Sequence, residues 1–300
     1  MKLAAIDIGT NTTLMLVAAA DRDRVEVLAE RAEITRLGRG IGGDGRLGRE
    51  GIERTLAVLT EYAQLARQHG ARIAAIGTEG LRCAPNAAEF LDPAAAILGV
   101  PVAVIDGDRE ALLSWRAAAS AFPDAAAGTM AVIDIGGGST EVIVAHAREL
   151  KWHRSLPLGS VRLTERHVRH DPASDGEVAA IFAEAEAALA VVPWPPRATL
   201  IGIAGTVTTL CAMAQNLASY DATRVHGHRL VATAIEAQAT RLRRSTQAER
   251  ERMAGLDPRR ADVILAGACL LLAIMRRAGA DELLVSDRGI RWGLLHEQIH

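Results

Sequence analysis

The amino-acid sequence predicts an α/β fold made of two similar domains, and two observations lead to this prediction. Short apolar runs rich in β-branched residues alternate with longer runs of helical periodicity along most of the 300 residues, which is typical of α/β domains. The second observation is an internal repeat, in which residues 4–19 read AAIDIGTNTTLMLVAA and residues 131–146 read AVIDIGGGSTEVIVAH. The segments align without gaps and both keep an aspartate, a glycine and a hydroxyl pair. Such a repeat indicates a duplicated domain.

Each copy of the repeat is expected to form a strand hairpin, and the other elements follow in order. The first half predicts a helix over 56–70, a strand running into a loop over 72–82, a helix over 87–99 and a strand followed by a helix over 100–122. The second half predicts a helix over 176–192, a Pro-rich connection over 193–197, a strand over 198–205 and mainly helices after it. A boundary near 122–124 gives domains 1–123 and 124–300, with the last helix a candidate to pack back on the first domain.

Composition and charge exclude several classes of protein. With 49% hydrophobic and 23% charged residues, the chain has the composition of a soluble globular protein. A net charge of −2 argues against a general nucleic-acid binder. The apolar run at 262–275 is shorter than the ~20 residues that span a bilayer, so we expect a buried helix and no membrane association.

The N-terminus shows no signal-peptide pattern, and three widely spaced cysteines form no CxxC motif. We therefore expect reduced cysteines and a cytoplasmic location. No GxxxxGK[ST] motif is present, because the chain has no suitably placed lysine.

The loops inside the two hairpins have the composition of anion-binding turns. A tight turn of small residues directs successive backbone N–H groups toward one point. Side chains of Thr10, Asn11 and Thr12 in the first loop, and of Ser139 and Thr140 in the second, add hydroxyl or amide groups. In the second loop the consecutive glycines Gly136, Gly137 and Gly138 indicate that something approaches the main chain closely. Gly205 and Thr206 lie in another strand-to-helix turn, a weaker candidate for a phosphate contact.

Asp7 and Asp134 lie at the ends of the first strands of the two hairpins, where lone charges are costly to bury. A divalent cation between these carboxylates and a phosphate would relieve that cost, and Mg²⁺ prefers such ligands. The alternative is that each aspartate caps its own turn.

Taken together, the two Asp-Gly hairpins resemble those of the actin-like, sugar-kinase-like ATPases, a ribonuclease H-like (ASKHA) fold with a central interdomain cleft. Further segments narrow the resemblance to the exopolyphosphatase / guanosine pentaphosphate phosphohydrolase (Ppx/GppA) family, as a short two-domain member. These segments are Asp7 to Thr12, Thr78-x-Gly80-x-Arg82, Ile105-Asp106-Gly107-x-x-Glu110-Ala111, Asp134 to Glu141, Ser155 to Glu165, Gly205-Thr206 and Ser286 to Leu295. They occur in the family's order and cover the chain.

The resemblance implies a role for several residues. Glu110 would be the general base that accepts the proton of the attacking water; the alternative is a first-turn glutamate that stabilises its helix. Arg82 would contact the phosphate chain, or else form a surface salt bridge. Glu141 would hold Mg²⁺ together with Asp7 and Asp134, with Mn²⁺ as a substitute. A cluster of basic residues over 166–170 is either a lip of the substrate site or a solvated face.

The chain departs from the family pattern at Glu79, which replaces a serine, and at Cys83, Asp106, Arg109 and Ala204. These departures bear on substrate preference more than on activity.

The sequence therefore predicts a hydrolase that releases orthophosphate, processively or stepwise, from the end of inorganic polyphosphate, and the resemblance implies a homodimer. The helical C-terminal domain of longer relatives is absent from this sequence, so short polyphosphate chains are the expected substrates. Three alternatives remain open at this point. They are a guanosine pentaphosphate 5′-phosphohydrolase, a non-catalytic sensor of polyphosphate or guanosine tetraphosphate, and a sugar-kinase-like transferase.

Overall fold

The structure is a computed structural model, and it describes residues 1–21, 24–39 and 45–299. The chain forms two compact units, one of Met1–Ala117 with Ile290–His300 and one of Ala118–Gly289. The domain division after residue 123 stays a prediction.

The first unit is built on a five-stranded mixed sheet in the order β3-β2-β1-β4-β5. Its strands are β1 (Lys2–Ile8), β2 (Thr13–Ala20), β3 (Val25–Glu33), β4 (Arg72–Gly77) and β5 (Val102–Val104). The predicted first hairpin is present as β1 and β2, which pair antiparallel, while β4 runs parallel to β1. The parallel arrangement places the ends of β1 and β4 at the same edge of the sheet, where the first loop begins.

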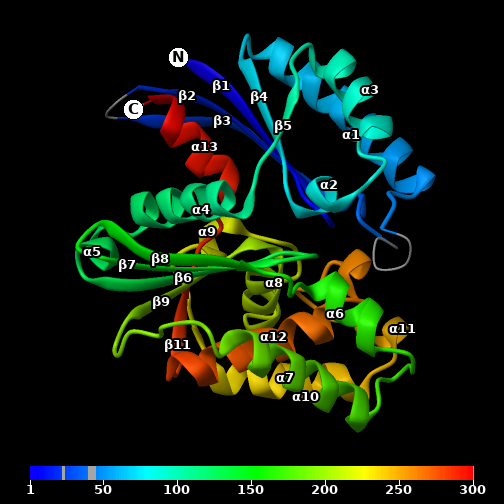
Figure 1. The fold of residues 1–300 in the computed structure, drawn as a ribbon, viewed down its shortest axis with the longest axis vertical. Coiled ribbons are helices and arrows are strands. Elements are labelled where there is room, and N and C mark those ends of the chain that lie inside the picture. Colours follow the sequence, from blue (N-terminus) through cyan, green and yellow to red (C-terminus); the bar gives the residue numbers. More distant parts are fainter. Residues whose placement is uncertain (22–23, 40–44, 300) are drawn as a thin grey trace. The chain divides into compact units, whose positions relative to one another are not determined.

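Helices cover both faces of this sheet (Figure 1). They are α1 (Arg49–Gln68), α2 (Glu79–Cys83), α3 (Ala88–Leu98), α4 (Gly107–Ala121) and α13 (Ile290–Ile299). Alternate residues of β1 point to opposite faces: Ile6 packs with the cluster that α1 and α3 complete, and Ala5 packs with residues of α4 and α13. A strand buried on both faces reads as a continuous apolar run, which is what the sequence of β1 shows.

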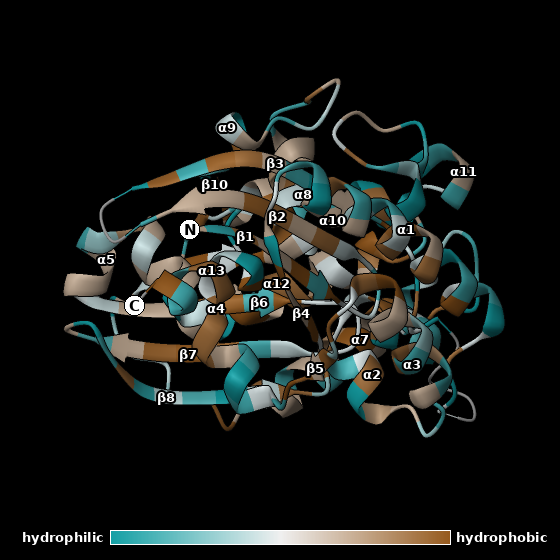
Figure 2. Ribbon diagram, turned by 90° about the horizontal axis from the view of Figure 1, so that it is seen from above, coloured by the Kyte–Doolittle hydropathy of each residue, from teal (hydrophilic) through white to brown (hydrophobic). Residues whose placement is uncertain are grey.

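The second unit contains a six-stranded mixed sheet in the order β10-β11-β9-β6-β7-β8. Its strands are β6 (Thr129–Ile135), β7 (Thr140–His146), β8 (Glu149–Leu156), β9 (Thr199–Ile203), β10 (Arg229–Val231) and β11 (Glu282–Val285). The predicted second hairpin is β6 and β7, and β9 lies parallel to β6. The edge strand β8 is mainly hydrophilic, whereas β7 beside it is apolar (Figure 2).

Four helices of the second unit pack around one long apolar helix, α12 (Ile264–Ala278). The other helices of this unit are α5 (Pro123–Ala127), α6 (Ser160–His167), α7 (Asp175–Leu189), α8 (Ala204–Ala214), α9 (Ala222–Val225), α10 (Ala232–Arg244), α11 (Gln247–Arg250) and the 3-10 helix η1 (Pro258–Arg260). Every residue of α12 from Ile264 to Met275 is buried, and α12 packs against α6, α7, α8 and α10. This confirms the prediction that the apolar run is a core helix. Among the described residues, no helix combines the length and the apolar character needed to cross a bilayer.

The two sheets repeat one topology, as the duplicated hairpins predict. The order β3-β2-β1-β4-β5 corresponds to β8-β7-β6-β9-β11, with the same antiparallel and parallel pairings around β1 and β6. One expectation needs correction, because the predicted loop after β4 contains the short helix α2. Thr78 has an extended backbone and accepts the first helical bonds from Leu81 and Arg82, so the turn of small residues opens a helix.

Candidate active site

The loop of each hairpin is closed by the same hydrogen bond. In the first loop (residues 9–12) the amide of Gly9 donates to the carbonyl of Thr12 at 3.0 Å. In the second loop (residues 136–139) the amide of Gly136 donates to the carbonyl of Ser139, also at 3.0 Å. The repeat therefore reproduces a backbone geometry as well as a sequence.

The carbonyls of the second loop cap the N-terminus of α6. The amide of Ser160 donates to Gly136 O at 3.0 Å, and the amides of Val161 and Arg162 both donate to Gly137 O, at 2.9 and 3.0 Å. The first N–H groups of a helix have no partner within the helix. Here the loop supplies those partners.

These contacts determine where the amides of the second loop point. Nε of Arg162 donates to Gly138 O at 2.8 Å, so three successive loop carbonyls face α6. In a trans peptide the C=O and the following N–H point in opposite directions. The N–H groups of Gly137, Gly138 and Ser139 are therefore turned away from α6. Successive amides turned to one side form a concave anion site.

The start of α6 packs closely on the consecutive glycines, which explains why residue 159 is itself a glycine. A Cβ placed on Gly159 would lie 2.2 Å from the carbonyl oxygen of Gly137 and 2.5 Å from the amide nitrogen of Gly138. Main chain therefore packs directly on main chain, as the sequence predicted for this loop. The approaching segment comes from the protein itself on this side of the loop.

The first loop is held by the segment that follows β3. The amide of Arg36 donates to Asn11 O at 3.0 Å, and the amide of Gly38 donates to Thr10 O at 2.8 Å. By the same planarity, the N–H groups of Asn11 and Thr12 point away from that segment. Both loops thus turn carbonyls toward a neighbouring segment of their own unit and the following amides away from that segment.

Two of the predicted phosphate-binding hydroxyls are already used as donors. Thr10 Oγ1 donates to Glu79 Oε2 at 3.3 Å, and Thr140 Oγ1 donates to Leu158 O at 2.6 Å. A hydroxyl has one proton to give. In this structure the hydroxyls of Thr10 and Thr140 therefore fix the loops. The phosphate contacts predicted for the side chains of Asn11, Thr12 and Ser139 stay predictions, beside those of the backbone amides.

In the second unit two predicted cation ligands lie side by side. Asp134 and Glu141 are cross-strand partners of β6 and β7, and their exposed fractions are 5% and 1%. Directly opposite residues lie on the same face of a sheet. Ser155 Oγ donates to Glu141 Oε1 at 2.6 Å and orients this carboxylate; sequence reasoning had placed Ser155 only within a family segment.

The donor set fits a hard divalent cation. Mg²⁺ is usually held by one or two carboxylates together with phosphate oxygens and waters, and Asp134 and Glu141 supply the carboxylates. The described residues contain no group of three or more His, Cys, Asp or Glu side chains that would form a complete metal site. In the first unit the remaining predicted ligand, Asp7, ends β1 just before the first loop and is also buried.

Glu110, the predicted general base, lies in the first turn of α4 and is paired with a predicted phosphate ligand. Arg82 Nη1 lies 3.2 Å from Glu110 Oε2 and donates to Ile105 O at 2.6 Å. The carboxylate is 4% exposed. Arg82 therefore orients Glu110 in this structure, a contact across 28 residues that no local pattern indicated.

Gly205 and Thr206 begin α8, directly after β9. Because β6 and β9 are parallel, this turn lies at the same sheet edge as the second loop. A Cβ on Gly205 would lie 2.5 Å from Nη2 of Arg260, so this guanidinium packs flat on the turn. Sequence reasoning missed Arg260, which comes from η1, more than fifty residues further along the chain.

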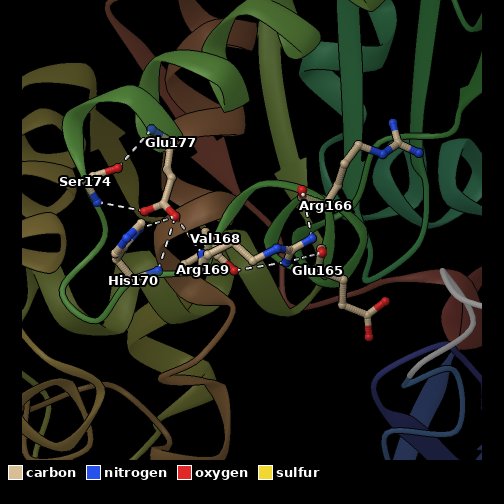
Figure 3. A network of polar contacts seen from close by, with 7 residues as sticks. All are labelled: Glu165, Arg166, Val168, Arg169, His170, Ser174 and Glu177. Carbon is tan, nitrogen blue, oxygen red and sulfur yellow. Dashed lines mark hydrogen bonds and ion pairs between the residues drawn. The ribbon is translucent and has the colours of Figure 1, made fainter.

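Three of the four basic residues over 166–170 are paired with acidic residues of α7, whereas the side chain of Arg169 donates to backbone carbonyls of residues 165–168. Arg166 and His167 contact Glu184, the latter at 2.5 Å, and His170 contacts Glu177 at 2.9 Å. Glu177 also accepts from the backbone amides of Arg169 and Ser174 (Figure 3). These pairings favour the solvated face over a lip of the substrate site.

Three comparisons connect this geometry to known proteins. The model of the "Ppx/GppA phosphatase family" matches residues 16–300. The "Exopolyphosphatase 2" of Mycobacterium tuberculosis is 36% identical, over 98% of this chain and 97% of that protein. A "Guanosine-5'-triphosphate,3'-diphosphate pyrophosphatase" of Aeromonas hydrophila is 30% identical, over 98% of this chain and 58% of that protein.

A solved structure of the Aquifex aeolicus PPX-GPPA enzyme superposes with a TM-score of 0.84 at 35% identity, covering 99% of each chain. The fold class is thereby confirmed as the two-domain actin-like arrangement of α/β domains. The family model matches most of the chain, and the duplicated loops have the backbone geometry expected of phosphate-binding turns. We therefore conclude that this chain belongs to the Ppx/GppA phosphatase family.

Proposed function

We propose that this chain is an exopolyphosphatase, which hydrolyses the terminal phosphoanhydride bond of inorganic polyphosphate and releases orthophosphate. The observation that carries the proposal is the orientation of the two loops, whose carbonyls accept from a neighbouring segment of the same unit so that the following amides point away from that segment. Backbone donors of this kind suit phosphoryl oxygens. The identity to the exopolyphosphatase 2 of M. tuberculosis supports the choice of substrate.

Phosphoanhydride hydrolysis needs positioning, charge stabilisation and a group that orients water. Glu110 is the proposed general base, and Arg82 holds its carboxylate in place. The amides of Asn11 and Thr12 and those of Gly137, Gly138 and Ser139 are the proposed phosphate donors. The start of α8 at Gly205 and Thr206 is a further proposed contact.

Asp134 and Glu141, with Asp7, are the proposed ligands of a divalent cation, Mg²⁺ or in its place Mn²⁺. When bound, such a cation neutralises charge on the phosphoryl oxygens. A cation would also lower the cost of keeping several carboxylates buried and charged.

Short chains are the proposed preferred substrates. A long polyphosphate needs many cationic contacts. Among the described residues, the arginines that the structure places beside the loops already contact protein groups: Arg82 and Arg162 donate to carbonyls, and Arg260 packs on the turn at Gly205. The basic side chains over 166–170 bind acidic residues or backbone carbonyls. Hydrolysis of guanosine pentaphosphate is a second candidate, favoured by the identity to the A. hydrophila pyrophosphatase. The homodimer that the resemblance implies stays a prediction, which light scattering of the purified protein would test.

Phosphate release from a substrate panel tests the proposal. The panel holds tripolyphosphate, long polyphosphate, guanosine pentaphosphate and ATP, each with and without Mg²⁺. We expect release from both polyphosphates only with the cation, and kcat/KM per chain end at least as high for tripolyphosphate. Guanosine pentaphosphate as the best substrate would move the assignment to the second candidate, and no release from either polyphosphate would overturn the proposal.

A further inference from the structure

Glu79 is a buried carboxylate of the first unit that the proposed mechanism leaves without a role. It begins α2, is 5% exposed, and stands where the family segment carries a serine. Its two oxygens accept from different groups: Oε2 from the hydroxyl of Thr10 at 3.3 Å, and Oε1 from the thiol of Cys83 at 3.7 Å. Burying a carboxylate at this place is costly unless it is hydrogen-bonded, so the contact with Thr10 has a structural consequence.

Thr10 fills a gap between two glycines. A Cβ on Gly38 would lie 2.4 Å from Thr10 Cγ2, and a Cβ on Gly80 would lie 3.1 Å from Thr10 Oγ1. The carbonyl of Thr10 accepts from the amide of Gly38. With its methyl enclosed, its carbonyl bound and its hydroxyl directed to Glu79, Thr10 has one available orientation. It anchors the first loop to the start of α2.

At the other end of α2, Arg82 contacts the proposed general base, Glu110. Arg82 follows Glu79 by three residues, so the two side chains leave neighbouring positions of the helix. Arg82 contacts Glu110 and the carbonyl of Ile105. One short helix thus binds the phosphate-type loop through Glu79 and the carboxylate of Glu110 through Arg82. All of these residues belong to the first unit.

We propose that Glu79 is a positioning residue, which sets the first loop in register with Glu110 by accepting a hydrogen bond from the hydroxyl of Thr10. This inference rests on the proposed function, because the register matters only if the loop holds the phosphoryl group that Glu110-oriented water attacks. Misplacement by about 1 Å of a group that orients a reaction lowers rates by up to about 10²-fold. The effect belongs to kcat, since the backbone amides that bind the substrate remain.

The first set of variants tests the hydrogen bond. Glu79→Ala removes the acceptor, Thr10→Val removes the donor at nearly constant shape, and Glu79→Gln keeps an acceptor oxygen. With tripolyphosphate we expect kcat to fall about tenfold or more in Glu79→Ala and in Thr10→Val, with KM changed less than about threefold. The double variant should be no slower than either single one. Glu79→Gln should recover most of the loss.

The second set separates positioning from a general loss of structure. In a Glu110→Gln background there is no general base whose position relative to the loop matters. Adding Glu79→Ala should therefore lower kcat less than about twofold there. A purely structural role would lower kcat by the same factor in both backgrounds. The control is Glu53→Ala on α1, which removes an exposed carboxylate paired with Arg49 and should leave kcat unchanged.

Full kcat in Glu79→Ala or Thr10→Val, or equal losses in both backgrounds, would overturn the inference. If Glu79→Ala does not fold, Thr10→Val still decides it, because it removes the donor of the same bond, and Glu79→Gln serves as the variant that keeps an acceptor. Absence of polyphosphate hydrolysis by the wild type would remove the proposed function and this inference together. Wild-type activity with undiminished variants would remove the inference alone.

Discussion

At the scale of single residues, the pairing of Arg82 with Glu110 changes how the site is understood. Sequence patterns assign Arg82 to the phosphate chain, and the structure places its guanidinium on a carboxylate and a carbonyl. A single guanidinium nitrogen, Nη1, makes both contacts. The pairing orients Glu110, and the contact of Arg82 with the phosphate chain stays a prediction.

Replacing Glu110 by Gln should lower turnover with little effect on folding. The amide keeps the shape and can still accept from Arg82, but it cannot take the proton of water. A positioned general base contributes about 10²–10⁴-fold, so kcat for tripolyphosphate should fall by that factor while the thermal midpoint of unfolding changes little. Retention of more than half of the wild-type kcat would exclude Glu110 as the base.

At the scale of elements, the contact between the second loop and the start of α6 depends on Gly159. Gly159→Ala would place a Cβ 2.2 Å from Gly137 O. The nearest atoms belong to the main chain of Gly137 and Gly138, so the backbone of the loop would have to shift. We expect a loss of about 1–3 kcal/mol in the free energy of unfolding together with loss of phosphate release, because the loop amides shift with the carbonyl.

The control for this variant is Gly176→Ala in the first turn of α7. A Cβ there meets no atom within 4 Å, and Ala is the better helix former. Urea denaturation and a phosphate assay of both variants give the comparison. Equal stability of the two alanine variants would show that the loop accommodates a side chain at residue 159.

Glu177 makes the stability of the α6–α7 connection depend on pH. Burial raises the pKa of Glu177, but hydrogen bonds from Ser174, His170 and Arg169 outweigh it and lower that pKa from 4.5 to about 2. A carboxyl with a depressed folded pKa stabilises the protein above its unfolded pKa, and this stabilisation is lost as pH falls toward the folded value.

Glu177→Gln keeps the capping box that Ser174 begins but removes the titration. Between pH 4.5 and pH 2 the free energy of unfolding of the wild type should therefore fall more steeply with falling pH than that of the variant. The difference between the two slopes should correspond to at most about one extra proton bound on unfolding. Denaturation at a series of pH values measures the two slopes. Parallel curves would contradict the assigned pKa.

At the scale of the whole molecule, the duplicated hairpins predict that two loops in different units serve one reaction. Asp7→Asn and Asp134→Asn should each lower kcat and raise the Mg²⁺ concentration needed for half-maximal rate. Residues that act as one unit are non-additive, so the double variant should lose clearly less than the product of the single losses. Multiplicative losses would mean that the two loops act independently.

The parts of the fold that the sequence predicted are those with a local signal. Alternation and apolar runs located both hairpins, and the length of the apolar run at 262–275 identified α12. The contacts missed are non-local: Thr10 with Glu79, Arg82 with Glu110, and Arg260 with Gly205 join residues that are far apart in the chain. No periodicity encodes such pairs.

The sequence predicted which side chains belong to the site, but not which acceptor each hydroxyl would bind. A hydroxyl in a loop has several acceptors within reach, and only the packed structure decides among them. Thr140 illustrates this, because its hydroxyl donates its hydrogen bond to Leu158 O. The resemblance identified the family because it rests on several segments that occur in a fixed order along the chain. That order is kept even where individual side-chain contacts differ.

The cap on α6 also changes the electronic character of the second loop. A carbonyl that accepts a hydrogen bond is polarised, and its peptide unit becomes a stronger donor at the other end, an effect of about 10–30% per bond. The loop peptides that accept from the amides of Ser160, Val161 and Arg162 thus extend the hydrogen-bonded rows of α6 by one link. The partial positive charge of the helix end is relayed through them to the amides of Gly137 and Gly138. Because no titratable proton is involved in this relay, the positive potential that these amides present to an anion does not depend on pH, unlike that of a histidine side chain.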